Sequence, residues 1–230
     1  MNADEKNIGR RAFIWLVLAG VVALFVGKDV FSRLTSGGSS SGSLGSGGTG
    51  SSGVPSGFRI NTAAGVPPFD PAIWRLTVDG LVGKPFALTF SQFTALPQTV
   101  VTRDFYCVEG WGVKDVAWKG VTVKELMQRA EVDPQATHLI FHSGDGVYTD
   151  SLTLDQAGLD DVLLVHELNG VQLPVNMGQP LRLIYPGHYG YKYVKWVERV
   201  EAINEKETPI VGYWEGYGYS VDATIPGAPN

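Results

Sequence analysis

The alternation of apolar and polar residues predicts several short strands after residue 58. Residues 73–79 and 195–204 alternate with a period of two, as expected for strands with one buried face. Four shorter apolar runs, bounded by turn residues, are also predicted to be strands: 86–90, 138–142, 162–167 and 181–185. The pattern therefore indicates a domain that contains many short strands.

Helical periodicity is less frequent in the same region. Residues 121–130 carry apolar side chains at positions i, i+3, i+4 and i+7, which predicts a helix with one buried face. Ser91 is positioned to cap a short helix that ends before Pro97, and residues 154–159 are predicted to form a single helical turn. Together with the strands, these elements predict an α+β fold for residues 58–230.

The N-terminal residues 1–34 have the pattern of a membrane anchor. Residues 12–27 lack any charged side chain and follow Lys6, Arg10 and Arg11. A helix of this length rises about 24 Å, and extending it to residue 31 brings it close to the roughly 30 Å hydrocarbon core of a bilayer. A buried core helix is the alternative, but such helices rarely lack a polar face. One N-terminal transmembrane helix is therefore predicted.

The flanking residues predict the orientation of this anchor and a tether behind it. The basic flank should stay in the cytoplasm, which places the remaining chain on the extracytoplasmic, periplasmic side. Residues 9–14 resemble a twin-arginine export signal, and no Ala-x-Ala cleavage site follows, so a retained anchor is favoured. Residues 35–57 consist almost wholly of Gly and Ser and are predicted to be a flexible linker.

Composition and charge exclude several classes of protein. Apolar residues make up 44% and charged residues 18% of the chain, so the chain as a whole is not disordered. Residues after 33 contain 13 basic and 20 acidic side chains, a balance that argues against a nucleic-acid partner. The single cysteine, Cys107, excludes an intrachain disulfide and any site built from several cysteines.

Cys107 is the first candidate for chemistry. It lies between Arg103 and Trp111, and a neighbouring cation could lower the pKa of its thiol. The thiol could then be a nucleophile, which needs a base such as one of the four histidines, or a metal ligand. An inert buried cysteine is the more ordinary alternative.

A second candidate is the segment from residue 178 to residue 196. Its apolar strand begins near Arg182 and ends in a loop that is rich in Gly and Pro and carries His188, Lys192 and Lys195. Glycine lets backbone N–H groups approach a ligand closely, while Lys and Arg neutralise phosphate charge. By spacing alone the segment is a weak indication of an anion site, with a basic surface loop as the alternative.

Together these segments resemble the molybdopterin-binding domain of the sulfite oxidase family. The resemblance runs from about residue 61 to residue 219, and it includes small bacterial members and the periplasmic methionine sulfoxide reductase catalytic subunits. It rests on five blocks in the family's order: residues 71–83, 107–111, 118–121, 180–182 and 190–196. Residues 212–219 match the small bacterial members as well.

The resemblance implies a Mo-molybdopterin cofactor with one molybdenum and one pterin dithiolene. Cys107 would be the thiolate ligand of the metal, and soft sulfur suits this metal. The predicted catalytic residues are Cys107 and Arg103. The predicted cofactor-binding residues are Asn61, Cys107, Ser143, Met177, Arg182, His188, Lys192, Tyr193, Val194 and Lys195. Within this set, Arg182 and Lys195 would hold the pterin phosphate, and Ser143 would supply a hydrogen bond.

Departures from the family pattern argue against sulfite as the substrate. Met177 stands where sulfite oxidases have a histidine and the reductases an asparagine, and Ile60 stands where an arginine accompanies the early asparagine, although Arg59 is adjacent. The aromatic pair that the reductases carry beside this asparagine is also missing after Asn61. A neutral sulfoxide or N-oxide is therefore predicted to be a better substrate than sulfite.

Three functions remain open at this point. The first is a membrane-anchored molybdoenzyme that transfers an oxygen atom and two electrons and receives its electrons from a separate cytochrome or quinone-linked membrane subunit. The second is a cofactor-binding or accessory subunit of a larger membrane redox complex without its own turnover. The third is a fold relative that has lost the metal and serves in protein interactions.

Overall fold

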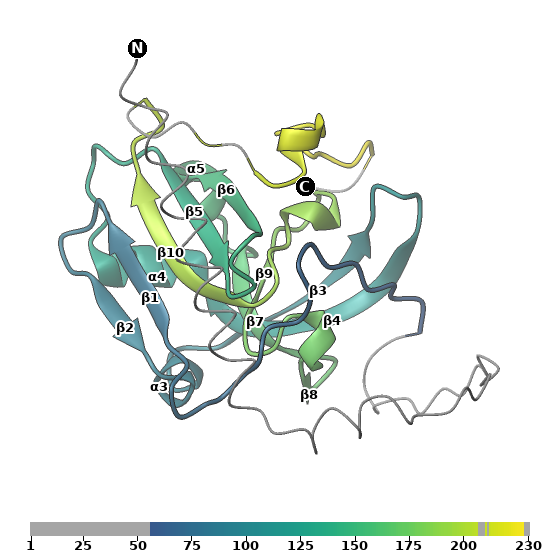
Figure 1. Ribbon diagram of the computed structural model, residues 1–230, viewed down its shortest axis with the longest axis horizontal. Coiled ribbons are helices and arrows are strands. Elements are labelled where there is room, and N and C mark those ends of the chain that lie inside the picture. The colour runs from purple at the N-terminus through teal and green to yellow at the C-terminus, as the bar shows by residue number, and fades with distance from the viewer. Residues whose placement is uncertain (1–55, 207–209, 211, 228–230) are drawn as a thin grey trace, which may run out of the picture. The chain divides into compact units, whose positions relative to one another are not determined.

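The computed structural model describes residues 56–206, 210 and 212–227, and this part of the chain folds around two five-stranded sheets (Figure 1). The first sheet has the order β2-β1-β10-β5-β6. Its strands are β1 (Leu76–Gly80), β2 (Phe86–Leu88), β5 (His138–Ser143), β6 (Thr149–Thr153) and β10 (Val197–Ile203). β1 and β10 are parallel, and the other pairs are antiparallel.

The second sheet has the order β3-β4-β7-β8, with β9 also paired to β7. Its strands are β3 (Thr99–Tyr106), β4 (Gly112–Thr122), β7 (Leu163–Leu168), β8 (Val171–Gln172) and β9 (Arg182–Ile184). All of its pairings are antiparallel. A single hydrophobic core draws side chains from both sheets, including the fully buried Trp118 of β4 and Phe141 of β5.

Few helices accompany the sheets, as the α+β prediction requires. The α-helices are α3 (Phe90–Thr94), α4 (Val123–Ala130) and α5 (Leu154–Ala157). Three short 3-10 helices follow: η2 (Val175–Met177), η3 (Gly190–Lys192) and η4 (Glu215–Tyr217).

The helix caps correct one sequence-based prediction. Thr89 caps α3, not Ser91, because its hydroxyl accepts the Gln92 amide at 3.1 Å while the Gln92 side chain accepts the Thr89 amide at 2.9 Å. This reciprocal capping box satisfies two helix-terminal N–H groups at once, which a cap at Ser91 would not do. The predicted strand over residues 86–90 therefore ends at Leu88.

Sequence periodicity missed the longest ribbon of the fold, the antiparallel pair β3–β4. The buried positions of β4 step by three residues from Val113 to Val116 and only then by two to Trp118. This step coincides with a bulge, at which Asp115 has a φ of 55° and donates its amide to the Asp104 carboxylate at 3.0 Å. The bulge shifts the alternation by one residue and hides the strand from a period-two pattern.

The predicted anchor over residues 1–34 and nearly all of the predicted linker over residues 35–57 lie outside the described residues. None of the helices in the described part of the chain has the length and apolar character needed to cross a bilayer.

Candidate active site

One large cavity brings together residues from five separate stretches of the chain. These are residues 58–63, the end of β3 with the β3–β4 turn, the β5–β6 turn, the segment around η2, β9 and η3, and residues 214–219. The lining residues are Phe58, Arg59, Ile60, Asn61, Thr62, Ala63, Phe105, Cys107, Val108, Glu109, Trp111, Ser143, Asp145, Tyr148, Met177, Arg182, Gly190, Tyr191, Tyr193, Lys195, Trp196, Trp214 and Tyr219.

Cys107 lies in the turn that joins β3 to β4. Its amide donates to the Trp111 carbonyl at 2.8 Å, and its carbonyl accepts the Gly110 amide at 3.1 Å. Gly110 has a φ of 85°, a backbone conformation that favours glycine, so the turn closes without strain. The ribbon thus holds the only cysteine of the chain at its tip, facing the cavity.

The thiol of Cys107 lies beside an acid and not beside the predicted arginine. Its Sγ is 3.7 Å from Glu109 Oε2, and this carboxylate also accepts the Trp111 indole N–H at 2.9 Å. Burial is the main effect that raises the pKa of Cys107, and the Glu109 charge adds to it.

Arg103, predicted to be catalytic, does not line the cavity. Its Nε donates to Asp161 at 3.1 Å, and its Nη1 donates to the Thr102 carbonyl at 3.0 Å. The predicted lowering of the thiol pKa by Arg103 is therefore wrong, because this guanidinium is paired with Asp161 and the pKa of the Cys107 thiol is raised.

Arg182 is a buried cation that pairs with no acid in residues 56–206, 210 and 212–227. Only 6% of the residue is exposed, and its guanidinium lies within 6 Å of the rings of Phe105, Trp118 and Tyr193. Nη1 donates to the Met177 carbonyl at 3.2 Å, whereas the buried Nε has no partner. Burial lowers the pKa of Arg182 to about 10, because the charged form is poorly solvated.

Lys195 adds a second cation to the same cavity. Its Nζ donates to the Asn61 carbonyl and lies 4.3 Å from the centre of the Trp196 ring. Burial, and then repulsion from Arg182, lower the pKa of Lys195 to about 7. In the described part of the chain neither Lys195 nor Arg182 forms an ion pair with a carboxylate.

Gly178 lets these two basic residues approach the backbone. It follows η2 with a φ of 116°, and a Cβ at this position would lie 3.1 Å from the Arg182 Cβ and 3.3 Å from Lys195. A larger residue would be strained by its backbone angle and would crowd both basic residues. The cavity therefore has an anion-attracting end that is built into the packing.

Seven of the eleven predicted site residues lie together on the cavity wall: Asn61, Cys107, Ser143, Met177, Arg182, Tyr193 and Lys195. Arg103, His188, Lys192 and Val194 do not. His188 stacks on Tyr185 at 3.6 Å between ring centres and has its Nδ1 3.0 Å from the Pro186 carbonyl. Val194 is fully buried in the core and accepts the Leu183 amide at 2.8 Å.

Lys192 is not an anion ligand, because two acids already surround it. Its Nζ lies 2.6 Å from Asp150 Oδ1 and 2.6 Å from Glu215 Oε1, and only 2% of its side chain is exposed. A buried ammonium paired in this way has no donor directed at the cavity. The prediction that Lys192 binds the cofactor is therefore corrected.

Sequence reasoning missed an acid and several aromatic residues of the site. Glu109 lies within the motif that indicated Cys107, so its position beside the thiol could have been predicted from that motif. Tyr148, Trp214 and Tyr219 come from distant segments that contact one another only in the folded chain. No spacing along the sequence indicates such contacts.

Comparison with known proteins gives this cavity a family. The sequence pattern of the oxidoreductase molybdopterin binding domain matches residues 63–211. The chain belongs to that family. This confirms the resemblance that the sequence motifs indicated and identifies the domain as a molybdopterin-binding oxidoreductase.

Individual relatives agree with this assignment. The oxidoreductase YuiH of Bacillus subtilis is 34% identical over 150 residues, which cover 65% of this chain and 74% of that protein. The protein-methionine-sulfoxide reductase catalytic subunit MsrP of Gluconobacter oxydans is 32% identical over 157 residues, which cover 60% of this chain and 49% of that subunit. The chain thus spans about half the length of the reductase subunit.

A solved structure supports the fold as well. The sulfane dehydrogenase SoxCD of Paracoccus pantotrophus superposes with a TM-score of 0.59 at 26% identity, covering 63% of this chain and 42% of that chain. Its similarity extends the family assignment from sequence to three-dimensional architecture.

The residues of the cavity fit a molybdopterin. A buried guanidinium with an unpartnered Nε, and an ammonium without a carboxylate, are unfavourable unless an anion joins them. The phosphate of the pterin is such an anion. At the other end of the cavity, the Cys107 thiol offers a soft sulfur ligand, which suits the metal of such a cofactor.

Proposed function

We propose that the protein is a Mo-molybdopterin oxidoreductase that transfers an oxygen atom and two electrons to or from a small uncharged substrate. The observation that carries this proposal is one cavity with a lone thiol and two cations that, among the residues the structure describes, have no acidic partner. The family assignment supplies the cofactor class, and the cavity supplies a place for each end of it.

In this proposal six of the lining residues have stated tasks. Arg182 and Lys195 hold the phosphate end, and Asn61 fixes Lys195 through its carbonyl. Cys107 provides the thiolate ligand from the rigid β3–β4 turn. The surrounding aromatic side chains, among them Phe105 and Tyr193, exclude water from the reacting centre. When bound, the cofactor supplies two-electron redox chemistry at a metal that can exchange an oxygen atom.

Neutral substrates are favoured by the charges around the thiol. Glu109 is the acid nearest to Cys107, and Arg59, whose guanidinium lies 5.8 Å from the Trp111 ring centre, faces the same carboxylate. These two charges offset one another, while Met177 and Ile60 add none. A doubly charged anion such as sulfite therefore finds no net positive charge at this end, so we propose a sulfoxide or an N-oxide.

Reduction of a sulfoxide consumes two electrons and two protons and yields the sulfide and water. The electrons come from a separate carrier, such as a cytochrome or a quinone-linked membrane subunit. The name of the Gluconobacter relative, a methionine-sulfoxide reductase subunit, supports this reaction class. The uncharged segment 12–27, its basic flank and the Gly/Ser-rich stretch support a membrane-anchored protein whose domain lies on the periplasmic side.

The first test measures metal content and the metal's spectrum. Purified protein should hold about one molybdenum per chain, and Cys107→Ser should lose or grossly alter the Mo(V) signal, because a hydroxyl is a poor ligand for a soft metal. Arg103→Ala serves as the matched control on the same ribbon and should keep both. An unchanged Mo(V) spectrum in Cys107→Ser would contradict the assignment of Cys107 as the metal ligand.

The second test measures turnover. With a reduced viologen dye as donor, the loaded protein should reduce dimethyl sulfoxide or an N-oxide. With ferricyanide as acceptor, it should oxidise sulfite poorly, since two missing charge-assisted contacts weaken binding by about two to four powers of ten. Fast sulfite turnover that saturates at micromolar concentration contradicts the substrate class. A fully loaded protein without turnover in either direction supports an accessory subunit instead.

A further inference from the structure

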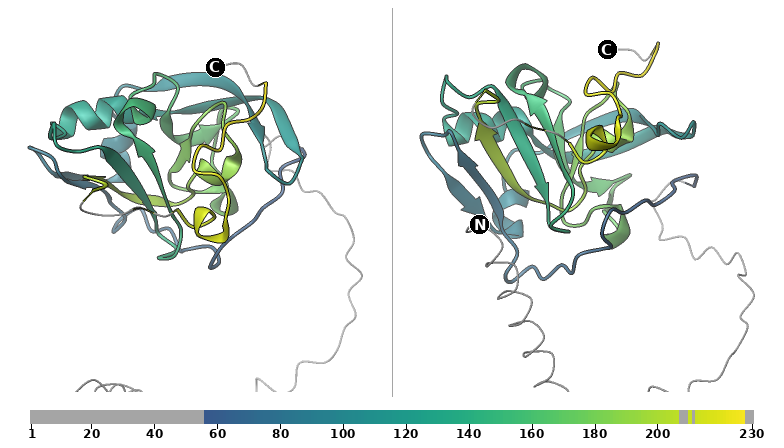
Figure 2. Two further views of the ribbon diagram at one scale, coloured as in Figure 1. Left: turned by 90° about the horizontal axis from the view of Figure 1, so that it is seen from above. Right: turned by 45° about the horizontal axis from the view of Figure 1, so that its top comes forward.

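The C-terminal segment from residue 212 to residue 220 forms one wall of the cavity. Trp214 and Tyr219 line it, with their ring centres 5.4 Å apart, and Tyr219 also contacts Tyr191 at 5.5 Å. This segment follows the last residue of the family match, residue 211. In both views of Figure 2 the yellow C-terminal segment lies beside a green part of the chain. Lys192 of η3 donates to Glu215 of η4 at 2.6 Å, which joins the two segments.

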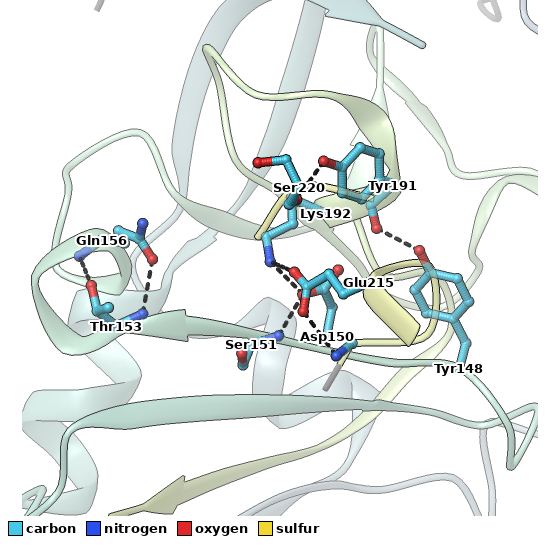
Figure 3. A network of polar contacts seen from close by, with 10 residues as sticks. Tyr148, Asp150, Ser151, Thr153, Gln156, Tyr191, Lys192, Glu215 and Ser220 are labelled. Carbon is cyan, nitrogen blue, oxygen red and sulfur yellow. Dashed lines mark hydrogen bonds and ion pairs between the residues drawn. The ribbon is translucent and has the colours of Figure 1, made fainter. Parts of the chain in front are cut away.

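A buried ionic cluster holds this segment in place (Figure 3). The side chains of Lys192, Asp150 and Glu215 are 2%, 2% and 5% exposed, and they come from η3, β6 and η4 respectively. We call these three residues the clasp. Lys192 lies between the two carboxylates, so it joins the C-terminal segment to the first sheet.

Other contacts around the clasp are directed to the same segment. Glu215 Oε2 accepts the Gly212 amide at 2.9 Å, and the Tyr213 amide donates to the Thr149 carbonyl at 2.9 Å. The Tyr191 hydroxyl donates to the Ser220 carbonyl at 2.6 Å. A Cβ at Gly212 would lie 2.8 Å from Glu215 Oε2 and 3.0 Å from Asp150 Oδ1, so the chain is packed directly onto the two acids.

The helix that carries Lys192 is itself fixed against the metal-ligand ribbon. A Cβ at Gly190 would lie 2.2 Å from the Phe105 ring, which means that η3 rests on the end of strand β3, two residues before Cys107. The clasp therefore connects the wall formed by Trp214 to the element next to the thiol. Loss of one clasp contact should move the wall and leave the sheets intact.

We propose that Lys192 is a positioning residue that, through Asp150 and Glu215, holds residues 212–220 as a closing wall over the active-site cavity. The wall narrows the access to Cys107 and contributes Trp214 and Tyr219 to the surface that a substrate meets. The inference deepens the proposed function and rests on it only for the nature of the substrate. The closure itself is a property of the chain without cofactor.

The chain's only cysteine makes the wall measurable without cofactor or substrate. The full-length protein, prepared without cofactor, is labelled at Cys107 with two uncharged reagents, small iodoacetamide and a bulky N-alkyl maleimide. The thiolate fraction affects both rates alike, so the ratio of the bulky rate to the small rate reports access alone. Glu215→Ala releases the wall and leaves Lys192 paired with Asp150, which avoids an unpaired buried charge.

Glu215→Ala and Trp214→Ala should each raise the bulky-to-small ratio about tenfold, and the double variant should not exceed the larger single effect, because both act through one wall. Lys124→Met, which breaks an exposed pair with Asp160, should leave the ratio unchanged. Amide exchange at residues 212–220 should speed up in Glu215→Ala, while the urea midpoint of the domain moves little.

An unchanged ratio in Glu215→Ala overturns the proposal, and so does an equal rise for both reagents, which signals general unfolding. In the molybdenum-loaded protein, Glu215→Ala should raise the KM for dimethyl sulfoxide about fivefold and change kcat less than twofold. A protein whose wall opens as described but which reduces no sulfoxide or N-oxide contradicts the proposed function and leaves the clasp standing.

Discussion

Two groups of cations lie next to each other in this fold and are balanced in opposite ways; Lys192 and Arg182 are buried, and Lys195 is half-buried. Lys192 is enclosed by two carboxylates, so its cluster carries one excess negative charge. Arg182 and Lys195 line the cavity, and in the described part of the chain neither is paired with an acid. The first group is complete within the protein and acts as a structural connection. The second is incomplete within the described part of the chain, and in the proposed function the phosphate of the cofactor supplies the missing charge.

The contrast also explains why charge alone does not identify a binding site. A buried ion pair that loses one partner is strongly destabilising, because the remaining charge stays in a medium that solvates it poorly. A buried cation that has no partner has already incurred this cost, so its removal should affect binding more than folding. Substitutions in the two groups should therefore separate stability from cofactor retention.

The largest expected effect is on stability in the clasp. Lys192→Met leaves Asp150 and Glu215 buried without a cation, and it should lower the free energy of unfolding of the cofactor-free protein by about 3–5 kcal/mol. Urea denaturation measures this loss. Lys124→Met, in an exposed pair with Asp160, is the control and should cost less than about 1 kcal/mol. If Lys192→Met lowers the free energy of unfolding by less than about 1 kcal/mol, the clasp does not stabilise the fold as predicted.

The next effect is on cofactor retention in the cavity. Arg182→Met removes a charge-assisted bond to an anion, which is expected to contribute about 1.5–3 kcal/mol, so molybdenum retained after gel filtration should fall at least tenfold. The cofactor-free variant should unfold within about 1 kcal/mol of the wild type, because a flexible apolar side chain fits between the three rings. Full retention of molybdenum would contradict the assignment of Arg182.

A smaller effect is expected in the pH dependence of stability. Burial, opposed by Lys192, raises the pKa of Asp150 to about 6 from its ordinary value of 3.8. The folded state then binds this proton more tightly than the unfolded state. The stability that Asp150 contributes is thus present below about pH 4 and is lost as the pH rises through about 6.

Asp150→Asn should remove this slope, so the stability difference between wild type and variant should change by about 1–3 kcal/mol between pH 4 and pH 7. Urea titrations at each pH measure it. Asp104→Asn is a control of opposite sign. The hydrogen bond from Lys114 holds the pKa of Asp104 at about 2, so its contribution is present above pH 4 and is lost at lower pH. A slope in Asp150→Asn equal to that of the wild type would contradict the prediction.

The smallest effect should come from Arg103. Its pair with Asp161 is half exposed, with 49% of the arginine side chain accessible, so Arg103→Ala should cost less than about 1 kcal/mol. Molybdenum content and turnover should stay within twofold of the wild type, as measured by metal analysis and viologen-linked kinetics. A tenfold loss of turnover would contradict this prediction and would indicate that Arg103 acts in the active site.

The sequence was sufficient for elements whose pattern is local. The helix over residues 123–130 and β10 follow from the periodicity of their apolar residues. β5 and β7 follow from short apolar runs, because both strands are buried at nearly every position. β4 was not predicted, because the bulge at Asp115 breaks the alternation of its apolar and polar residues. Membrane anchoring by residues 1–34 remains a prediction.

For the site, family motifs located the residues, but only the fold distinguished their partners. Lys192 and Lys195 are three positions apart in one basic loop, and nothing in that loop separates them. Their roles differ because Asp150 and Glu215, 42 and 23 positions away, reach the first and not the second. Arg103 is adjacent to the motif of Cys107, yet it pairs with Asp161 across 58 positions.

The placement of the cavity walls has a consequence for how this active site can be re-engineered. The segment matched by the family ends at residue 211 and begins at residue 63, whereas Asn61 on one side and Trp214 and Tyr219 on the other lie outside it. In the proposed function, Cys107, Arg182 and Lys195 would hold the cofactor and lie inside the matched segment, whereas Trp214 and Tyr219 would shape the entrance from outside it. Exchanging residues 212–227 between relatives, with Glu215 retained, should therefore transfer substrate preference as a module while the metal-binding ribbon stays untouched.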